Sequence, residues 1–444
     1  MPALDIDGAF QASPSSPPPR PPSPDVPRRN SFVARSVSRS LSWGGASPSL
    51  EKLEMRAQRI FGAKLGELQD PLMEADDMEM RTALQNALAA LEETFLVARL
   101  TIALYSYLGL GTQWTGKLLR LILYAMLLLP GFIQMAVYYF FSPRITRSIV
   151  YGAAARNRLD IHRPPANQTA PEGGFPVVIY ITGGAWTIGY KAWGSLLGRR
   201  LSKHGVIVYC LDYRNFPQGT VLDMLRDCNT GIRWVLHHAQ QNGGDPSRVH
   251  LVGQSCGAQL ATLALITQTE QEHQKAQLPG GFPAWSPQRV QSLIGVSGVY
   301  NCFDLADHFN QRGLYRRLFD RIMSVNGRAA LKLFSPTYCV KGVEWGAQLP
   351  RVLLLHGTGD TCALFSNATQ FRDALQEVGA KVELKSYEGE THTSPLIENP
   401  MRGGHDQLVD DILAAVGGPE KGSPTQSPLC PAFLINAAAR VCPF

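Results

Sequence analysis

The chain has 444 residues, more than a single hydrophobic core usually organises, so we expect one large domain with additional segments. Apolar residues make up 45% of it and the net charge is only +6, which argues against a wholly disordered chain, a polytopic membrane protein and a nucleic-acid-binding protein. The eight cysteines include no C-x-x-C pair, which argues against a disulfide scaffold and a structural zinc site.

The first 50 residues differ in composition from the rest of the chain. They hold ten of the 31 prolines and eleven serines, with five arginines and neither lysine nor glutamate. Such a segment cannot bury enough apolar surface to offset its ordering entropy, so we predict a disordered leader over residues 1–50. An Arg- and Ser-rich, acid-poor leader is also typical of a transit peptide. Residues 51–99 turn charged with helical spacing, which predicts an amphipathic helical segment.

A membrane region is predicted over residues 100–141. Its second part, residues 121–141, is a stretch of 21 residues without a charge. At about 1.5 Å per residue, a helix of this length matches the hydrocarbon thickness of a bilayer. We therefore predict a transmembrane helix, kinked at Pro130 and Gly131, with a buried core helix as the alternative. A weaker uncharged stretch, residues 100–116, is either a second span or an interfacial helix.

Short apolar runs alternate with segments of helical period over residues 151–416. Near-continuous apolar strands separated by helices are typical of a parallel sheet covered on both faces, and therefore of one α/β domain. The predicted strands are residues 177–182, 206–211, 249–252, 290–296, 352–355 and 381–386. Residues 417–444 show no clear period, and we predict an irregular tail there.

The strongest local signal is Gly253-Gln254-Ser255-Cys256-Gly257, which fits G-x-S-x-G. A predicted strand precedes Ser255 and a helix rich in small residues follows it, as in the nucleophile elbow of the α/β-hydrolase fold. Glycines are needed there because the turn is strained and neighbouring backbone packs closely. Ser255 is therefore the predicted nucleophile of an α/β-hydrolase, with an ordinary tight turn as the alternative.

A serine hydroxyl is a weak nucleophile until a base removes its proton. On this fold the acid and the base follow the serine in that order, each after a later strand. Asp360 and His392 both follow later predicted strands, at the same edge of the sheet as Ser255. We predict Asp360 as the orienting acid and His392 as the base. Glu390 stays open as a second acid, and His356 is expected to be structural.

Thr182-Gly183-Gly184-Ala185-Trp186 follows the first predicted strand of the domain, where this fold carries its HGGG-type loop. Backbone N–H groups of Gly184, Ala185 and Cys256 are the predicted donors to a tetrahedral oxyanion. Cys256 is expected to be a small packing residue rather than a second nucleophile. We expect neither a metal nor a cofactor.

Five blocks of sequence together resemble the plant isoprenylcysteine α-carbonyl methylesterases. They are TGGAWTIGYKAWGSLLG (182–198), LDYRNFPQGT (211–220), GGDPSRVHLVGQSCGA (243–258), LLHGTGD (354–360) and YEGETHT (387–393). The resemblance covers residues 151–416 and the preceding membrane segment. It implies the triad Ser255, Asp360 and His392. It also implies oxyanion or substrate contacts by Gly183, Gly184, Ala185, Gln254 and Cys256.

The resemblance implies a serine esterase that hydrolyses the methyl ester of a carboxyl-terminal isoprenylcysteine, releasing methanol and reversing carboxyl methylation. The implied partners are prenylated, carboxyl-methylated proteins or prenylcysteine methyl esters and a lipid membrane, but no nucleic acid. The implied location is the endoplasmic reticulum and Golgi membrane, with the catalytic domain in the cytosol. The alternatives are a broad-specificity membrane carboxylesterase and a hydrolase-fold ligand receptor without catalysis.

One local departure from the family concerns the nucleophile turn. The family pattern reads S-A-G-A-H where this chain reads Ser255-Cys256-Gly257-Ala258-Gln259. Cys256 is bulkier than alanine beside the predicted oxyanion donors, so the rate or the accepted substrate size is expected to differ.

Overall fold

The computed structural model describes residues 112–275, 282–312, 316–418 and 426–443 of the chain. Three predicted segments fall wholly or mostly outside these residues: the leader (1–50), the amphipathic segment (51–99) and the possible second span (100–116).

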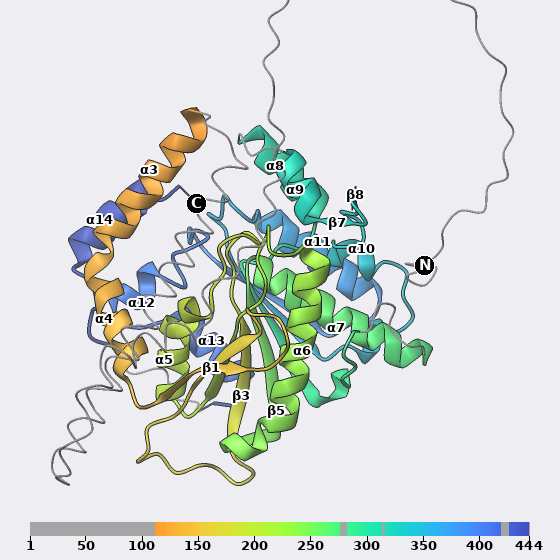
Figure 1. The fold of residues 1–444 in the computed structure, drawn as a ribbon, viewed down its shortest axis with the longest axis horizontal. Coiled ribbons are helices and arrows are strands. Elements are labelled where there is room, and N and C mark those ends of the chain that lie inside the picture. The colour runs from red at the N-terminus through yellow and green to blue at the C-terminus, as the bar shows by residue number, and fades with distance from the viewer. Residues whose placement is uncertain (1–111, 276–281, 313–315, 419–425, 444) are drawn as a thin grey trace, which may run out of the picture. The chain divides into compact units, whose positions relative to one another are not determined.

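An eight-stranded, mostly parallel sheet forms the centre of the described structure (Figure 1). Its order is β1-β2-β4-β3-β5-β6-β9-β10, in which β1 and β2 run antiparallel to their neighbours and all other pairs are parallel. The strands are β1 (Ile145–Val150), β2 (Arg158–His162), β3 (Phe175–Ile181), β4 (Ile207–Leu211), β5 (Gly244–Gln254), β6 (Val290–Val296), β9 (Arg351–Gly357) and β10 (Val382–Tyr387). All six predicted strands are confirmed. A separate hairpin consists of β7 (Ser324–Val325) and β8 (Arg328–Ala329).

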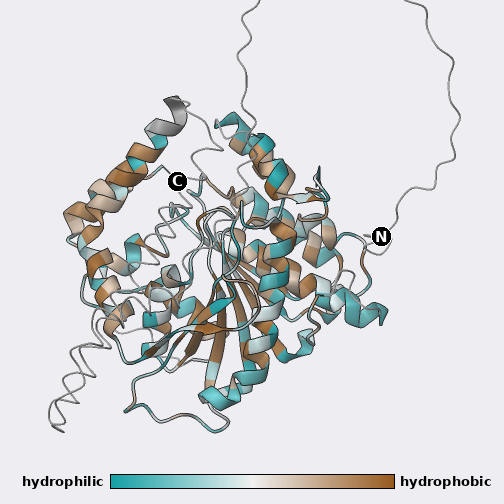
Figure 2. Ribbon diagram, viewed as in Figure 1, coloured by the Kyte–Doolittle hydropathy of each residue, from teal (hydrophilic) through white to brown (hydrophobic). Residues whose placement is uncertain are grey.

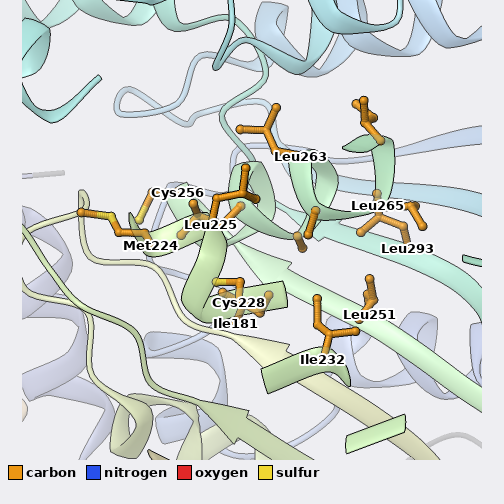
Figure 3. Packing of buried hydrophobic residues seen from close by; sticks show 14 of the residues in the cluster. Ile181, Met224, Leu225, Cys228, Ile232, Leu251, Cys256, Leu263, Leu265 and Leu293 are labelled. Carbon is orange, nitrogen blue, oxygen red and sulfur yellow. The ribbon is translucent and has the colours of Figure 1, made fainter. Parts of the chain in front are cut away.

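Helices cover both faces of the sheet because the central strands are apolar on both sides. In β3, Val177, Ile179 and Ile181 face one apolar cluster, which includes residues of α6, α7 and α11 (Figure 3). Val178 and Tyr180 face a second cluster with α5 and α13. This two-residue alternation between two buried faces confirms the predicted α/β-hydrolase architecture. The helices on the faces are α5 (Ser195–Lys203), α6 (Val221–His238), α7 (Cys256–Gln274), α11 (Phe365–Glu377) and α13 (Gln407–Ala415).

Four further helices are α8 (Cys302–Gln311), α9 (Arg316–Ile322), α10 (Pro336–Cys339) and α12 (Glu398–Arg402).

The sheet begins earlier in the chain than the predicted domain start at residue 151. Strands β1 and β2 were not predicted, because both are short and carry charged residues rather than apolar runs; β1 lies at the edge of the sheet and β2 lies next to it. A register irregularity in β1 follows from Ser148, which adopts a positive φ of 57°.

The predicted span over residues 121–141 is not a single helix, and the kink predicted at Pro130 and Gly131 is a full break at Leu128. The segment forms α3 (Thr112–Leu127) and α4 (Leu129–Phe141), which are bent by 68° relative to each other. Pro130 lacks an N–H and Leu128 leaves the helical region, which explains the break. In the described ranges, no single helix is both long enough and apolar enough to span a bilayer. Taken together, α3 and α4 meet this criterion of length and composition.

The bent helix pair is buried on one side only. Tyr124, Leu128, Met135 and Tyr139 are buried against the rest of the described structure. The opposite side exposes large apolar side chains: Leu119, Ile122, Leu123, Met126, Leu129, Ile133, Val137 and Phe141. They are eight of the eleven exposed large apolar side chains in the described ranges, so the exposed apolar surface is concentrated here. Figure 2 shows the ribbons of α3 and α4 coloured largely as hydrophobic.

The carboxyl-terminal tail is not irregular as predicted, because residues 432–441 form α14 (Ala432–Val441). Ile435 and Ala438 are buried in the same apolar cluster as Tyr124 and Leu128, and α14 runs beside α3 (Figure 1). The run of alanines in this segment favours helix, and its apolar side is covered by α3.

A buried polar cluster joins α4 to the sheet. The Tyr139 hydroxyl donates to Oδ2 of Asp160 in β2 at 2.7 Å and accepts from Nζ of Lys191 at 2.8 Å. Lys191 is also 3.3 Å from Oδ1 of Asp160, and the Ser148 N–H donates to that oxygen at 2.7 Å. Asp160 and Lys191 are almost fully buried, so each needs these partners.

Tyr139→Phe should lower the free energy of unfolding by about 1–3 kcal/mol, because it removes a hydroxyl that serves two buried charged groups. Urea unfolding measures the change. Tyr138→Phe is the matched control, because the contact between the Tyr138 hydroxyl and the partly buried Arg144 is long, at 3.5 Å, and therefore weak. Equal unfolding midpoints for the two variants would contradict the role given to this cluster.

Candidate active site

Ser255 occupies a strained turn between β5 and α7. Its φ is 54° and its ψ is −123°, a conformation that non-glycine residues rarely adopt. A Cβ on Gly253 would lie 2.5 Å from the Ala258 backbone, and one on Gly257 would lie 2.2 Å from the carbonyl oxygen of Ile181. These close approaches explain why glycine stands on both sides of the serine, as the elbow predicts.

The structure brings the three predicted catalytic side chains into one hydrogen-bonded chain. Nε2 of His392 lies 3.0 Å from Oγ of Ser255, and Nδ1 of His392 lies 2.7 Å from Oδ2 of Asp360. Ser255 is 8% exposed and His392 is 9% exposed, so the site is largely shielded from water. This geometry allows His392 to take the serine proton while Asp360 orients the imidazole.

Asp360 is held in its ionised form. Burial raises the pKa of its carboxyl, but the charge of His392 and hydrogen bonds from His356 and His392 outweigh burial and leave the pKa well below its usual range. The N–H groups of Cys362 and Ala363 donate to Oδ1 at 2.8 and 3.0 Å. A carboxylate that stays charged at neutral pH is what stabilises an imidazolium beside it.

The rival side chains are engaged elsewhere. Nε2 of His356 lies 2.7 Å from the Ala363 carbonyl and 3.2 Å from Asp360, so His356 supports the acid rather than the serine. Glu390 accepts hydrogen bonds from Ser394 and Asn399, and no contact with His392 is among its described bonds. Glu390, the candidate second acid, therefore stabilises its own loop and does not orient His392.

The loop after β3 is the predicted oxyanion loop, and it carries unusual backbone strain. Gly184, Ala185 and Trp186 have φ values of 131°, 48° and 60°, all on the left-handed side. A Cβ on Gly184 would lie 2.4 Å from the Gly189 nitrogen, and one on Gly183 would lie 2.1 Å from Oε1 of Gln254. Gln254, a predicted substrate contact, thus lies directly against Gly183.

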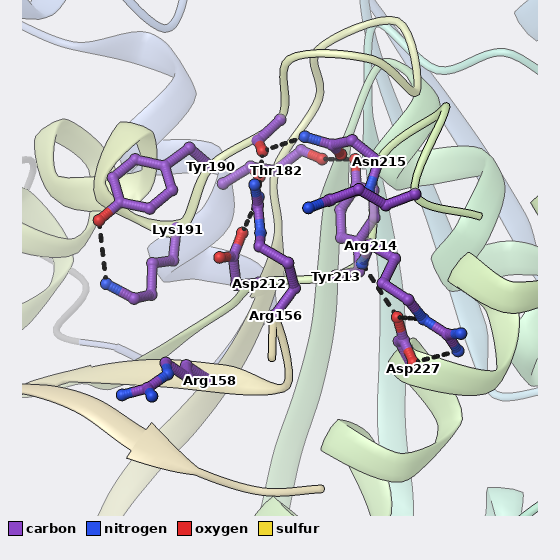
Figure 4. Close-up of polar contacts among 12 residues, drawn as sticks. Arg156, Arg158, Thr182, Tyr190, Lys191, Asp212, Tyr213, Arg214, Asn215 and Asp227 are labelled. Carbon is purple, nitrogen blue, oxygen red and sulfur yellow. Dashed lines mark hydrogen bonds and ion pairs between the residues drawn. The ribbon is translucent and has the colours of Figure 1, made fainter. Parts of the chain in front are cut away.

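Side chains from the second resemblance block hold this loop from behind (Figure 4). The Tyr213 hydroxyl donates to the Thr182 carbonyl at 2.8 Å. Nδ2 of Asn215 donates to the Gly189 carbonyl at 2.7 Å, and Arg156 donates to the same oxygen at 2.6 Å while pairing with Asp212 at 2.6 Å. These are positioning residues that the sequence motifs did not identify.

Cys256 is buried under the oxyanion loop and is a packing residue, as expected. It lies in the apolar cluster with Met224 and Leu225 of α6 (Figure 3). Burial raises the pKa of its thiol, against the lowering effect of hydrogen bonds from the backbone of Trp186 and Ala185. The Trp186 nitrogen is 3.3 Å from the sulfur.

The three predicted oxyanion donors stay candidates. The N–H groups of Gly184 and Ala185 belong to the strained loop after β3. Cys256 lies at the first turn of α7, where helix amides lack helical acceptors.

Gln259 is a further positioning residue. Its Oε1 accepts from the Trp186 indole at 2.7 Å, and its Nε2 donates to the Phe334 carbonyl at 2.6 Å. Gln259 is fully buried, so both ends of its amide need these partners. The only signal for it in the sequence was its departure from the family's histidine.

The loop that carries His392 is tied to α3. Oε1 of Glu398 accepts from the Thr393 hydroxyl at 2.9 Å and from the Tyr124 hydroxyl at 2.7 Å. Burial raises the pKa of Glu398, and hydrogen bonds from Tyr124 and Thr393 oppose that rise. The exposed apolar helix pair is therefore connected to the loop beside the catalytic histidine.

Comparison with known sequences places the chain near plant methylesterases. The isoprenylcysteine alpha-carbonyl methylesterase of Arabidopsis thaliana is 44% identical over 365 residues, which cover 80% of this chain and 83% of that protein. A protein of Oryza sativa subsp. japonica with the same name, qualified as probable, is 44% identical over 364 residues, covering 80% and 85%.

Comparison at the level of domains and structures agrees on the fold. A family model described as BD-FAE matches residues 159–375. The crystal structure of Lactobacillus rhamnosis esterase B inhibited by a tributyrin phosphonate superposes with a TM-score of 0.50 at 17% identity, covering 69% of this chain and 97% of that one. At this identity the likeness concerns the fold alone.

Asp360→Asn should lower kcat about ten-thousandfold, because the amide no longer stabilises the imidazolium or selects its tautomer. Hydrolysis of any accepted ester measures the effect. Glu390→Gln is the control and should leave kcat close to that of the unchanged chain. A large loss in Glu390→Gln with little loss in Asp360→Asn would assign the acid to Glu390 instead.

Proposed function

The chain belongs to the isoprenylcysteine α-carbonyl methylesterase family and is a carboxylic-ester hydrolase, and we propose that its substrate is the methyl ester of a carboxyl-terminal isoprenylcysteine. The observation that carries this proposal is the 44% identity with plant relatives of that name over most of both chains. The ester is presented either by a prenylated protein or by a free prenylcysteine methyl ester. The products are methanol and the prenylcysteine carboxylate.

The proposed reaction has two steps through an acyl-enzyme. His392 takes the proton of Ser255, the serine oxygen attacks the ester carbonyl, and His392 returns the proton to the departing methanol. The N–H groups of Gly184, Ala185 and Cys256 stabilise the oxyanion as it forms. Water activated by His392 then cleaves the acyl-enzyme and releases the carboxylate, which restores Ser255.

We also propose that the enzyme works at a membrane surface, at the endoplasmic reticulum and Golgi, with the catalytic domain on the cytosolic side. A prenyl chain partitions into lipid, so an enzyme in contact with the same lipid meets it at a higher local concentration. The exposed apolar side of α3 and α4 supports contact with lipid. Because the other side of this pair is buried on the catalytic domain, we propose that the pair lies in the interface rather than across the bilayer.

The substrate proposal predicts a preference that depends on the prenyl group. We expect kcat/KM for S-farnesylcysteine methyl ester to exceed that for S-methylcysteine methyl ester about a hundredfold or more, because the apolar chain is the only difference and the leaving group is the same. A short-chain aryl ester extends the comparison, and Ser255→Ala should abolish turnover of all three. Equal kcat/KM for the two cysteine esters would identify a broad-specificity carboxylesterase.

The membrane proposal predicts that Ile122→Gln combined with Val137→Gln weakens binding to phosphatidylcholine vesicles at least about tenfold, since two exposed apolar side chains no longer enter the interface. Vesicle flotation measures binding, and turnover of the soluble S-methylcysteine ester should not change. Val150→Gln, at an exposed apolar residue on β1, is the control. Unchanged vesicle binding by the double variant would refute contact through this helix pair.

A further inference from the structure

A cavity of about 460 Å³ lies between α4, α5 and residues 426–429, and none of the three triad residues lines it. Four of its lining residues carry nitrogen groups that are positively charged or can become so. Arg199, Arg200 and Lys203 belong to α5, and His204 is the residue that ends this helix. The proposed esterase reaction uses none of them.

The basic side chains form one stripe of α5. Together with Leu196 they recur at helical positions i+3, i+4, i+7 and i+8, which places them on a single side of the helix. Cations at a helix carboxyl end also stabilise the helix dipole, which accounts for one or two of them. The dipole does not explain why all four line the same cavity.

The positive charge around the cavity is only partly neutralised. Arg200 is 3% exposed and pairs with Asp406 of α13 at 2.9 Å, but its Nε and Nη2 have no hydrogen-bond partner among the described residues. Burial, and then the charges of Arg199, Arg144 and Arg200, lower the pKa of the Lys203 amine. A buried guanidinium with unused donors among other cations fits an anionic group that accepts several hydrogen bonds.

Other acidic side chains offer little compensation. Besides Asp406, Asp410 of α13 is the acidic group whose charge acts on Arg200 and His204. Asp410 is itself 2.6 Å from His405. The cluster therefore keeps a net positive charge.

The cavity lies directly beside the exposed apolar side of α4. Gln134 lines it from α4 and donates to the Leu429 carbonyl at 2.7 Å. Its neighbours Ile133 and Val137 are 54% and 56% exposed. A positively charged site next to such a surface suits a ligand that joins a negatively charged group to a long apolar chain.

We propose that this cavity binds the phosphate-bearing headgroup of an anionic phospholipid, with Arg199, Arg200 and Lys203 around the phosphate and the acyl chains against the exposed side of α3 and α4. The proposal extends the membrane contact proposed above and rests on it. It gives the enzyme a preferred lipid as well as a preferred surface.

The test compares binding of the full chain to vesicles of phosphatidylcholine alone and to the same vesicles containing phosphatidic acid. Arg199→Gln combined with Lys203→Gln should weaken binding to the anionic vesicles about thirtyfold, since each basic residue near such a surface contributes about 1 kcal/mol. Binding to phosphatidylcholine alone should not change. Arg200 is left in place because it pairs with a buried carboxylate, and thermal unfolding checks that the variant is folded.

The matched control removes the same charge elsewhere, by Arg328→Gln combined with Lys332→Gln, two exposed residues near β8. Equal losses in both double variants would overturn the proposal, because net charge alone would then explain binding. Undiminished preference for anionic vesicles in the α5 variant would also overturn it.

Inorganic phosphate, titrated calorimetrically, distinguishes the two sources of a phosphate group. Phosphate binding that the α5 variant loses, without any preference of the unchanged chain for phosphatidic acid, would assign the cavity to a soluble phosphate and refute the lipid assignment. If the unchanged chain binds vesicles without any preference for phosphatidic acid, the headgroup site alone is refuted. If the unchanged chain binds no vesicle, the membrane contact is refuted as well.

Discussion

The left-handed backbone of the oxyanion loop is the constraint on which the rest of the site depends. Ala185 and Trp186 are non-glycine residues at positive φ, and each such residue costs of order 1–3 kcal/mol unless its surroundings impose it. Here the surroundings are polar and buried. Tyr213 and Asn215 bind the loop carbonyls from one side, while Gln259 binds the Trp186 indole from the other. The donors to the oxyanion are thus fixed before a substrate arrives.

The bent helix pair, α3 and α4, is connected to the oxyanion loop and to the loop of His392. Lys191 follows the oxyanion loop by a few residues and reaches Tyr139 of α4, while Glu398 links Tyr124 of α3 to Thr393, next to His392. The two helices therefore contact both halves of the site, the oxyanion loop and the histidine loop. A surface that meets lipid through α3 and α4 would orient the catalytic groups relative to that lipid without a separate anchor domain.

The sequence was sufficient for the features that local order determines. Six strands, the elbow and the triad follow from apolar runs and from the order of serine, acid and base along this fold. The positioning contacts were not predictable, because Asp160 with Lys191 and Glu398 with Tyr124 pair side chains far apart in the chain. The uncharged run at 121–141 is a different case, because length and apolarity reveal neither the break at Leu128 nor that one side of the segment is covered by protein.

Cys256 and Gln259, the two departures from the family pattern near the nucleophile, differ in their hydrogen bonding. A neutral histidine in place of Gln259 would offer one donor and one acceptor, and the glutamine amide supplies the same pair to the Phe334 carbonyl and the Trp186 indole. A histidine at this position has the donor and the acceptor that the same two partners require. Cys256 differs, since alanine offers no acceptor and the thiol accepts from the Trp186 amide. Of the two changes, the cysteine is the one that contacts the backbone of the oxyanion loop.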